Sequence, residues 1–394
     1  MVVLKRFLLR SFHLLRLFLY FPFDSLVRRH TNKIQNQTLL IIKLEGIGDY
    51  ILFRNFIEIL KNHPQFSEYR ITLCGNTSFK NFAESFDSSF INDFIWMNPK
   101  KFQTNPLYRK KMLREIRHRG FDTVIYPTHS RDSLLGDSIV RCSGARNRIG
   151  TAGDDVHAKD WERKFFNRYY TQLIKIPDNI YFEFLRNKNF FEQLLDEQLS
   201  ISKPFLRITQ SSSFDIPKPY VVMCPDAQLY KRRWDINNFL ILSEHLYKQY
   251  QLISVYTGGK PIDRENIELK NHQFIIDLTG KTTLTETVEL ISAASLVVAN
   301  DTGVSHIGVA LDKPVVVISN GNHYGRFTYL PEVYDKISYV FPPKFYKYNF
   351  TSEQLVQNYK YGSFLNINTI TIEQVLKTVH NAINNYCRDK NDSR

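Results

Sequence analysis

Residues 296–319, LVVANDTGVSHIGVALDKPVVVIS, predict a strand, a sharp turn, a short helix and a second strand. The apolar run 296–299 leads into Asn-Asp-Thr-Gly, and Lys313-Pro314 ends the helix before the next strand. The run 315–318 is continuously apolar, which is typical of a strand that a parallel sheet buries on both faces. The residues at helical spacing between the strands are Val304, Ile307, Gly308 and Leu311. The stretch therefore predicts one β-α-β unit of an α/β fold.

The turn at residues 300–303 favours binding of a phosphate or pyrophosphate. A helix N-terminus presents backbone N–H groups and positive dipole charge to an anion. Thr302 adds a hydroxyl, and His306 stands about one turn into the helix. Any α/β crossover has such a turn, however, so a second interpretation is that Asp301 or Thr302 only caps the helix.

Length and composition limit the class of protein. A chain of 394 residues exceeds one ordinary core and predicts two domains. The net charge of +13 predicts an anionic partner, unless coding bias inflates the lysine content. No RNA-binding motif, zinc finger or basic recognition helix favours nucleic acid as that partner. The four cysteines lie far apart without a C-x-x-C pair, so a reducing cytosol fits better than a disulfide framework or a zinc site.

Residues 1–37 differ from the rest, with seven Lys and Arg side chains and a single acid, Asp24. The longest uncharged run, 17–23, is far shorter than the ~20 residues of a membrane-spanning helix. Arginines interrupt the apolar region of any signal peptide. We therefore predict a helix lying on the cytoplasmic face of the inner membrane, with its cations on anionic headgroups. The alternative is a helix docked on the protein's own surface.

Residues 38–210 predict a first Rossmann-like domain. The strand TLLIIKL (38–44) is followed by a turn with Gly46 and Gly48, which allow another molecule to approach the backbone closely. The dinucleotide motif is incomplete, because Arg54 lies beyond the turn where a third glycine is needed. Asp49 stands at the carboxyl edge of the strand, where open α/β sheets bind ligands. It is either a general base or a cap for its helix.

A basic cluster in the same domain is a candidate for gripping a phosphorylated acceptor. The cluster consists of Arg141, Arg146 and Arg148, at the end of the next helix and after it, and Arg131 leaves the carboxyl end of the predicted strand 121–126. We expect this cluster close to the carboxyl edge of the sheet. There it could bind a phosphorylated acceptor, because guanidinium groups match phosphate oxygens well. The alternative is ordinary solvated charge.

Residues 211–345 restart the β/α rhythm and predict a second Rossmann-like domain. Its strand ends carry small polar or turn residues, which suit a nucleotide, and the basic loop 231–233 can neutralise a diphosphate. Two such halves describe the GT-B arrangement, in which two doubly wound parallel sheets face a central cleft. In residues 346–394 a capped helix with Val375 and Val379 is expected to pack back across the interface.

With these residues in place, the chain resembles glycosyltransferase family 9, the ADP-heptose:lipopolysaccharide heptosyltransferases and their relatives. Four segments match in order over about residues 38–385. The segments are KLEGIGD (43–49), the strand-helix segment 122–150, KRRW (231–234), and DLTG (277–280) through NDTGVSH (300–306) to Lys313-Pro314.

The resemblance implies a role for each matching residue. Asp49 would deprotonate the acceptor hydroxyl, and Thr302 and Gly303 would hold the donor diphosphate. Arg232, or Lys231 beside it, would neutralise that diphosphate as it leaves. The other implied donor-binding residues are Asp301, His306 and Gly280, and the acceptor-binding residues are Gly46, Gly48, Arg131, Arg146 and Arg148.

The implied reaction is an inverting transfer of a heptose or similar sugar to a lipid-linked glycan of lipopolysaccharide or another surface polysaccharide. The implied donor is a nucleotide-sugar such as ADP-heptose. The resemblance also implies that no metal or other cofactor is required, and the absence of D-x-D from the chain agrees with this. The loop 319–326 replaces the family's usual Gly-Pro-Thr run beside the sugar. Two alternatives are a non-catalytic nucleotide-binding or membrane scaffold with the same fold, and an oxidoreductase, which the incomplete glycine motif disfavours.

Overall fold

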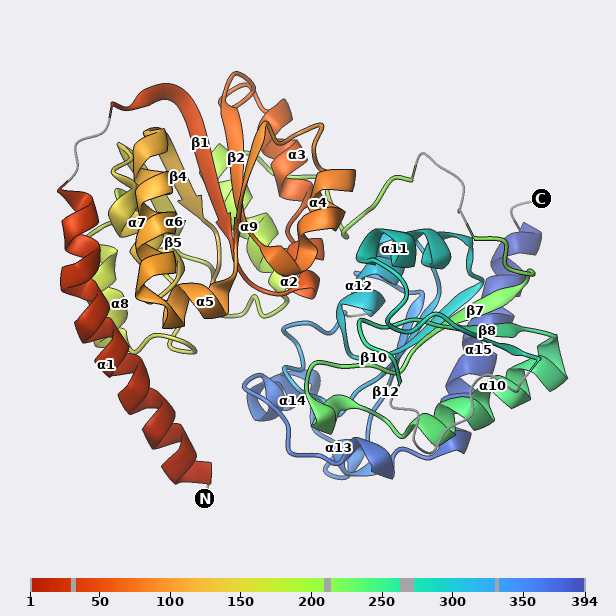
Figure 1. Ribbon diagram of the computed structural model, residues 1–394. Helices are drawn as coiled ribbons and strands as arrows, with labels where there is room; N and C mark the ends of the chain where they lie inside the picture. The colour runs from red at the N-terminus through yellow and green to blue at the C-terminus, as the bar shows by residue number, and fades with distance from the viewer. Residues whose placement is uncertain (1, 30–32, 209–213, 263–272, 330–332, 393–394) are drawn as a thin grey trace. The chain divides into compact units, whose positions relative to one another are not determined.

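The computed structural model describes residues 2–29, 33–208, 214–262, 273–329 and 333–392. It contains two compact units (Figure 1). The first comprises Met1–Gly46, Phe56–Ile180 and Leu185–Leu199, and the second comprises Ile47–Asn55, Tyr181–Phe184 and Ser200–Arg394. Among the described residues, no helix has both the length and the apolar character needed to cross a bilayer.

The first unit is built on a parallel sheet of six strands in the order β3-β2-β1-β4-β5-β6. This order confirms the predicted doubly wound α/β class. The strands are β1 (Gln35–Lys43), β2 (Arg70–Asn76), β3 (Asp93–Met97), β4 (Phe121–Tyr126), β5 (Asn147–Thr151) and β6 (Gln172–Ile174). The helices of this part of the chain are α1 (Val2–Arg28), α3 (Asn55–Asn62), α4 (Lys80–Phe86), α5 (Pro99–Thr104), α6 (Pro106–Arg119), α7 (Gly136–Ser143), α8 (Asp160–Asn167) and α9 (Glu183–Leu195).

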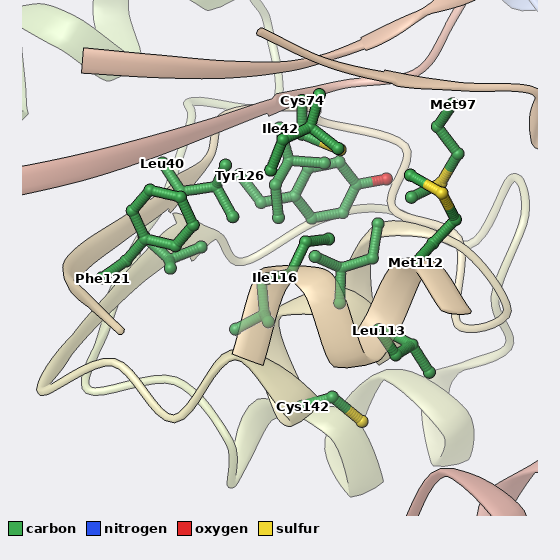
Figure 2. Packing of buried hydrophobic residues seen from close by; sticks show 14 of the residues in the cluster. Leu40, Ile42, Cys74, Met97, Met112, Leu113, Ile116, Phe121, Tyr126 and Cys142 are labelled. Atoms are coloured by element: carbon green, nitrogen blue, oxygen red, sulfur yellow. The ribbon is translucent and has the colours of Figure 1, made fainter. Parts of the chain in front are cut away.

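The core of the first unit lies between the sheet and α6. Figure 2 shows side chains of β1, β2 and β4 meeting Met112, Leu113 and Ile116 of α6. The strand side chains are fully or almost fully buried, as the apolar run TLLIIKL predicts. Those labelled in the figure include Leu40, Ile42, Cys74, Phe121 and Tyr126.

The N-terminal helix α1 is a docked part of the first unit and packs against α6 and α7. Asp24, the single acid of this segment, is fully buried and accepts two hydrogen bonds from Arg109, at 2.8 Å from Nε and 2.6 Å from Nη2. Leu17 and Tyr20 are buried with Phe166 of α8. The docked alternative is therefore correct for this face of the helix.

The second unit is built on another parallel sheet, in the order β12-β11-β10-β7-β8-β9. The strands are β7 (Tyr220–Cys224), β8 (Ile253–Tyr256), β9 (Ile275–Asp277), β10 (Leu296–Asn300), β11 (Val315–Ile318) and β12 (Ile337–Val340). The helices are α2 (Ile47–Ile51), α10 (Ile236–Tyr250), α11 (Leu284–Ala293), α12 (Gly303–Ala310), α13 (Pro343–Tyr346), α14 (Ser352–Tyr359) and α15 (Ile372–Asp392). The β10-α12-β11 unit confirms the pattern of residues 296–319.

Two segments group differently from the order along the chain. Residues 47–55, expected in the first domain, belong to the second compact unit, and that unit resumes at Ser200, before the expected boundary at 210. Arg54 and Asn55 explain the first difference, because both donate hydrogen bonds to the Phe205 carbonyl, at 2.6 and 3.0 Å. In α15, Val375 and Val379 are buried in the core of the second unit.

Candidate functional site

At the turn between β10 and α12, the side chain of the N-cap residue does not make the usual capping hydrogen bond. Thr302 occupies the N-cap position with an extended backbone, and its side chain makes no capping hydrogen bond. Asp301 does not replace it, because its carboxylate accepts from Ser319 Oγ at 3.2 Å and pairs with Arg232. The interpretation that these residues only cap the helix is therefore not supported, and the N-terminus of α12 keeps the features of an anion site.

Arg232 lies against this turn. Its Nη2 is 3.0 Å from Asp301 Oδ2 and donates to the Asp301 carbonyl at 2.5 Å. Its Nε is buried and has no hydrogen-bond partner among the described residues, so one donor of the guanidinium is unused there. Lys231 lies differently, because its ammonium donates to the Ser363 carbonyl at 3.1 Å and lies 5.6 Å from the Phe364 ring centroid. Of the two predicted cations, Arg232 is the one placed at the turn.

A buried asparagine fixes the basic loop to the end of β10. The Asn300 amide donates to the Pro225 carbonyl at 2.6 Å and accepts from the Trp234 backbone N–H at 3.2 Å. Trp234 is itself buried, and its indole N–H donates to the Ile370 carbonyl at 2.9 Å. Asn300 therefore positions the loop that carries Arg232. Sequence reasoning noted Asn300 only as a strand end and missed this role.

His306 is a buried, neutral side chain one turn into α12. Burial lowers the pKa of His306 to about 4; nearby Asp301 opposes that shift and Arg232 adds to it. The ring Nδ1 lies 3.1 Å from the Tyr329 hydroxyl. At neutral pH this ring is a fixed dipole beside the turn rather than a cation.

Two glycines allow α2 to pack tightly against α12. A Cβ atom at Gly48 would lie 2.9 Å from His306 Cδ2, and one at Gly303 would lie 2.9 Å from Ile47 Cγ2. The sequence predicted that another molecule approaches Gly48, but the close neighbour there is the His306 ring of the protein's own α12. Asp49 follows Gly48 in the first turn of α2 and is half-buried. This packing brings the predicted base and the predicted diphosphate turn into one compact unit.

We expect Gly48→Ala to disturb this contact. The added methyl would meet His306 well inside van der Waals distance, so the variant should lose about 1–3 kcal/mol of unfolding free energy. Gly259→Ala is the matched control, because no described residue lies within 4 Å of its Cβ position. Urea unfolding followed by circular dichroism measures both variants. Equal stability of the two would show that α2 and α12 are not closely packed in solution.

At the carboxyl edge of the first sheet the structure gathers polar side chains that the sequence did not single out. Thr128 Oγ1 donates to Glu45 Oε1 at 2.7 Å, and Lys43 Nζ lies 3.3 Å from Glu45 Oε2. Beside them, Ser130 Oγ donates to Asp154 Oδ2 at 2.9 Å. Gly46, a predicted acceptor-binding residue, directly follows Glu45 and is exposed. The sequence could have indicated this site, because Glu45, Thr128 and Ser130 come after β1 and β4. Ligands of open α/β sheets bind beyond the carboxyl ends of the strands.

The predicted basic cluster is not assembled at that edge. Arg131 is buried, with Nη2 donating to Asn167 at 2.5 Å and its guanidinium 4.7 Å from the Tyr170 ring centroid. Arg146 bonds Asp122 at 3.2 Å at the start of β4. Arg148 donates to backbone carbonyls, including that of Tyr169 at 2.6 Å. The expectation that Arg146 and Arg148 lie close to the carboxyl edge is wrong, because they flank the first residue of β5.

The buried Arg131 belongs to an internal polar network. The Tyr170 hydroxyl donates to Asp137 at 2.5 Å, and Arg131 Nε lies 3.6 Å from the same Asp137 oxygen. Burial raises the pKa of Asp137 to about 6, which Arg131 and the Tyr170 hydrogen bond oppose. These contacts give Arg131 a structural role within the first unit.

The remaining predicted donor-binding residue, Gly280, and the loop 319–326 both lie in well-packed loops of the second unit. Gly280 has φ of +68°, and a Cβ there would meet Pro261 at 2.5 Å, so this turn requires glycine. In the unusual loop 319–326, Asn322 Oδ1 accepts from the Ser363 N–H at 3.3 Å and His323 Nδ1 lies 3.0 Å from the Lys360 carbonyl. The loop is thus tied to residues 360–363. Within the described ranges, no cluster of His, Cys, Asp and Glu side chains could hold a metal ion.

Comparisons with known proteins agree on one family. The model of glycosyltransferase family 9 (heptosyltransferase) matches residues 109–329, more than half of the chain. Lipooligosaccharide heptosyltransferase 2 of Haemophilus influenzae is 26% identical over 164 residues, covering 36% of this chain and 46% of that protein. Lipopolysaccharide heptosyltransferase 2 of Salmonella typhimurium is 26% identical over 138 residues, covering 33% and 40%. The chain thus spans about half the length of the curated relatives it matches or less.

Solved structures show the same fold. A glycosyl transferase of family 9 from Veillonella parvula has a TM-score of 0.66 at 17% identity, covering 89% of this chain and 98% of that one. Heptosyltransferase WaaC of E. coli, solved with ADP-2-deoxy-2-fluoro heptose, has a TM-score of 0.64 at 14% identity, covering 87% and 99%. The fold is the GT-B type of two α/β units, as predicted, and the chain belongs to glycosyltransferase family 9.

Proposed function

We propose that this protein is an inverting, metal-independent glycosyltransferase that moves a heptose or similar sugar from a nucleoside-diphosphate donor to a lipid-linked glycan. The observation that carries the proposal is the packing of α2 on α12, where Gly48 contacts His306 and Gly303 contacts Ile47. It brings the segment of Asp49, a candidate base, to the anion-binding turn of Thr302 and Gly303. Family membership supports the reaction class.

In the proposed reaction the acceptor hydroxyl oxygen attacks the anomeric carbon from the face opposite the diphosphate. Asp49 takes the hydroxyl proton, the new C–O bond forms, and the bond from the anomeric carbon to the diphosphate oxygen breaks. The N–H groups at Gly303 and the unused donor of Arg232 stabilise the leaving nucleoside diphosphate. His306 is neutral, so its ring contributes no positive charge to the binding of the diphosphate. These groups neutralise the diphosphate without a metal ion.

The proposed donor and acceptor follow from what related proteins are named for. The curated relatives are heptosyltransferases of lipooligosaccharide or lipopolysaccharide, and the WaaC structure was solved with an ADP-heptose analogue. We therefore propose ADP-heptose or a close analogue as donor, with the loop 319–326 contacting the sugar. We also propose a peripheral location on the inner face of the cytoplasmic membrane, where lipid-linked acceptors are presented.

A thermal-shift panel tests the donor site. ADP at about 100 times its Kd should raise the melting temperature by about 5–10 °C, because binding to the folded state alone stabilises it. Arg232→Ala should remove most of this shift, whereas Arg233→Ala, which loses an ion pair with Asp226, should keep it. No shift with ADP, UDP or GDP, or with their sugars, would favour the scaffold alternative. A shift with NADH alone would favour an oxidoreductase.

A further inference from the structure

The outer face of α1 is an apolar stripe on an otherwise basic helix. Five large apolar side chains of this face are between 49% and 71% exposed. Since an α-helix turns about 100° per residue, they fall within an arc of about 120°. The five residues of this outer stripe are Phe12, Leu15, Phe18, Leu19 and Leu26. Monomeric proteins rarely expose a continuous apolar strip of this kind without a partner.

The opposite face of the helix is fixed to the first unit. Leu17, Tyr20, Asp24 and Val27 are buried there, and their helical positions lie opposite the outer stripe. Arg141 holds the same face by donating to the Phe21 carbonyl at 3.0 Å, with its guanidinium 3.5 Å from the Phe21 ring centroid. His13 Nε2 lies 3.0 Å from Glu162 Oε1 of α8. The outer stripe therefore lies on a helix whose opposite face is docked on the first unit, and Figure 1 shows α1 running beside α8.

Charge identifies what covers the stripe. The single acid of residues 1–37, Asp24, is buried and neutralised by Arg109, so the exposed surface of α1 carries no carboxylate from this segment. Arg28 and Arg29 are exposed at its C-terminal end. Because the only acid of this segment is buried, two copies paired through the stripe would bring cations together without an exposed carboxylate of this segment to offset them. An apolar stripe on a helix that itself exposes cations and no carboxylate matches the boundary between acyl chains and anionic headgroups.

From these observations we infer that the outer stripe of α1 inserts into the surface of an anionic phospholipid bilayer and fixes the orientation of the first unit on it. The inference deepens the proposed peripheral location and names the residues that contact lipid. It does not depend on the transfer reaction. The buried ion pair of Asp24 with Arg109 attaches the helix to the first unit.

Vesicle co-sedimentation of the full chain tests the inference. The protein should bind vesicles containing phosphatidylglycerol more tightly than vesicles of phosphatidylcholine alone. A Leu15→Glu/Leu19→Glu variant should lose at least about tenfold in its partition coefficient, because two apolar side chains leave the bilayer. Leu107→Glu is the matched control, since Leu107 is an exposed leucine of the same unit outside the stripe. It should bind like the parent protein.

Three results would overturn the inference. They are absence of vesicle binding by the parent protein, equal binding by the parent protein and the double variant, or an equal loss in Leu107→Glu. Sedimentation velocity distinguishes membrane binding from self-association. If the parent protein forms a dimer but binds no vesicles, and the double variant is monomeric, the stripe contacts a second copy of the chain. Transfer to a soluble acceptor lacking lipid should be the same in all variants. Absent transfer with intact vesicle binding would count against the proposed function alone.

Discussion

The Asp49→Asn variant should lose about 10²–10⁴-fold in kcat for sugar transfer while keeping the fold and the affinity for nucleoside diphosphate. An amide has the shape of the carboxylate but cannot take the proton of the acceptor hydroxyl, and a positioned general base contributes about this factor. Asp49 lies inside the first turn of α2 (Ile47–Ile51), where asparagine keeps the shape and polarity of the side chain and loses only its charge. The substitution therefore separates the base from the cap, the two interpretations that the sequence left open.

The measurement is single-turnover transfer with saturating donor and acceptor, together with calorimetry of ADP binding. Asp49→Ala is a useful companion, because it also removes the polar side chain from the first turn of α2. An Asp49→Asn variant with full activity, or one that loses ADP binding and transfer together, would contradict the assignment of Asp49 as the base.

Removing the carboxylate of Asp24 should destabilise the first unit by about 3–5 kcal/mol. Asp24→Ala leaves the Arg109 guanidinium buried without its counter-ion, and an uncompensated buried charge is costly. Replacing both partners with apolar side chains, as in Asp24→Leu/Arg109→Met, should recover most of the loss. Lys164→Gln is the control, because it breaks an exposed ion pair with Asp160 and should leave stability nearly unchanged.

Urea unfolding, followed by near-ultraviolet circular dichroism, measures these free energies. Helix α1 should detach or unfold in Asp24→Ala, and limited proteolysis should then cleave within residues 11–29. If Asp24→Ala and Lys164→Gln have the same stability, the buried ion pair does not hold α1 in solution.

The strands and their order were largely predictable, because apolar runs such as 315–318 mark buried parallel strands directly. The docking of α1 was not predictable, since it depends on Asp24 and Arg109, which are 85 residues apart. Nor was the placement of residues 47–55 in the second unit. It follows from their packing with α12 and their hydrogen bonds to Phe205, which no local pattern encodes.

The error over Arg146 and Arg148 was avoidable. Both stand at the start of a strand, and in a parallel sheet every strand starts at the amino edge. Residues that follow strands, such as Thr128 and Ser130, are the ones at the carboxyl edge. The direction of the chain was thus sufficient to exclude these two arginines from that edge, although it could not show that Arg131 is buried.

In the proposed reaction Asp49 is the base and the turn at Thr302 and Gly303 holds the diphosphate of the nucleotide-sugar, and the transfer inverts the anomeric carbon. The most direct measurement is transfer from ADP-heptose to a lipid-linked acceptor in the presence of EDTA, with the new linkage examined by NMR. We expect release of ADP and a glycosidic bond whose anomeric configuration is opposite to that of the donor. A product with retained configuration, or complete dependence on an added metal ion, would contradict it.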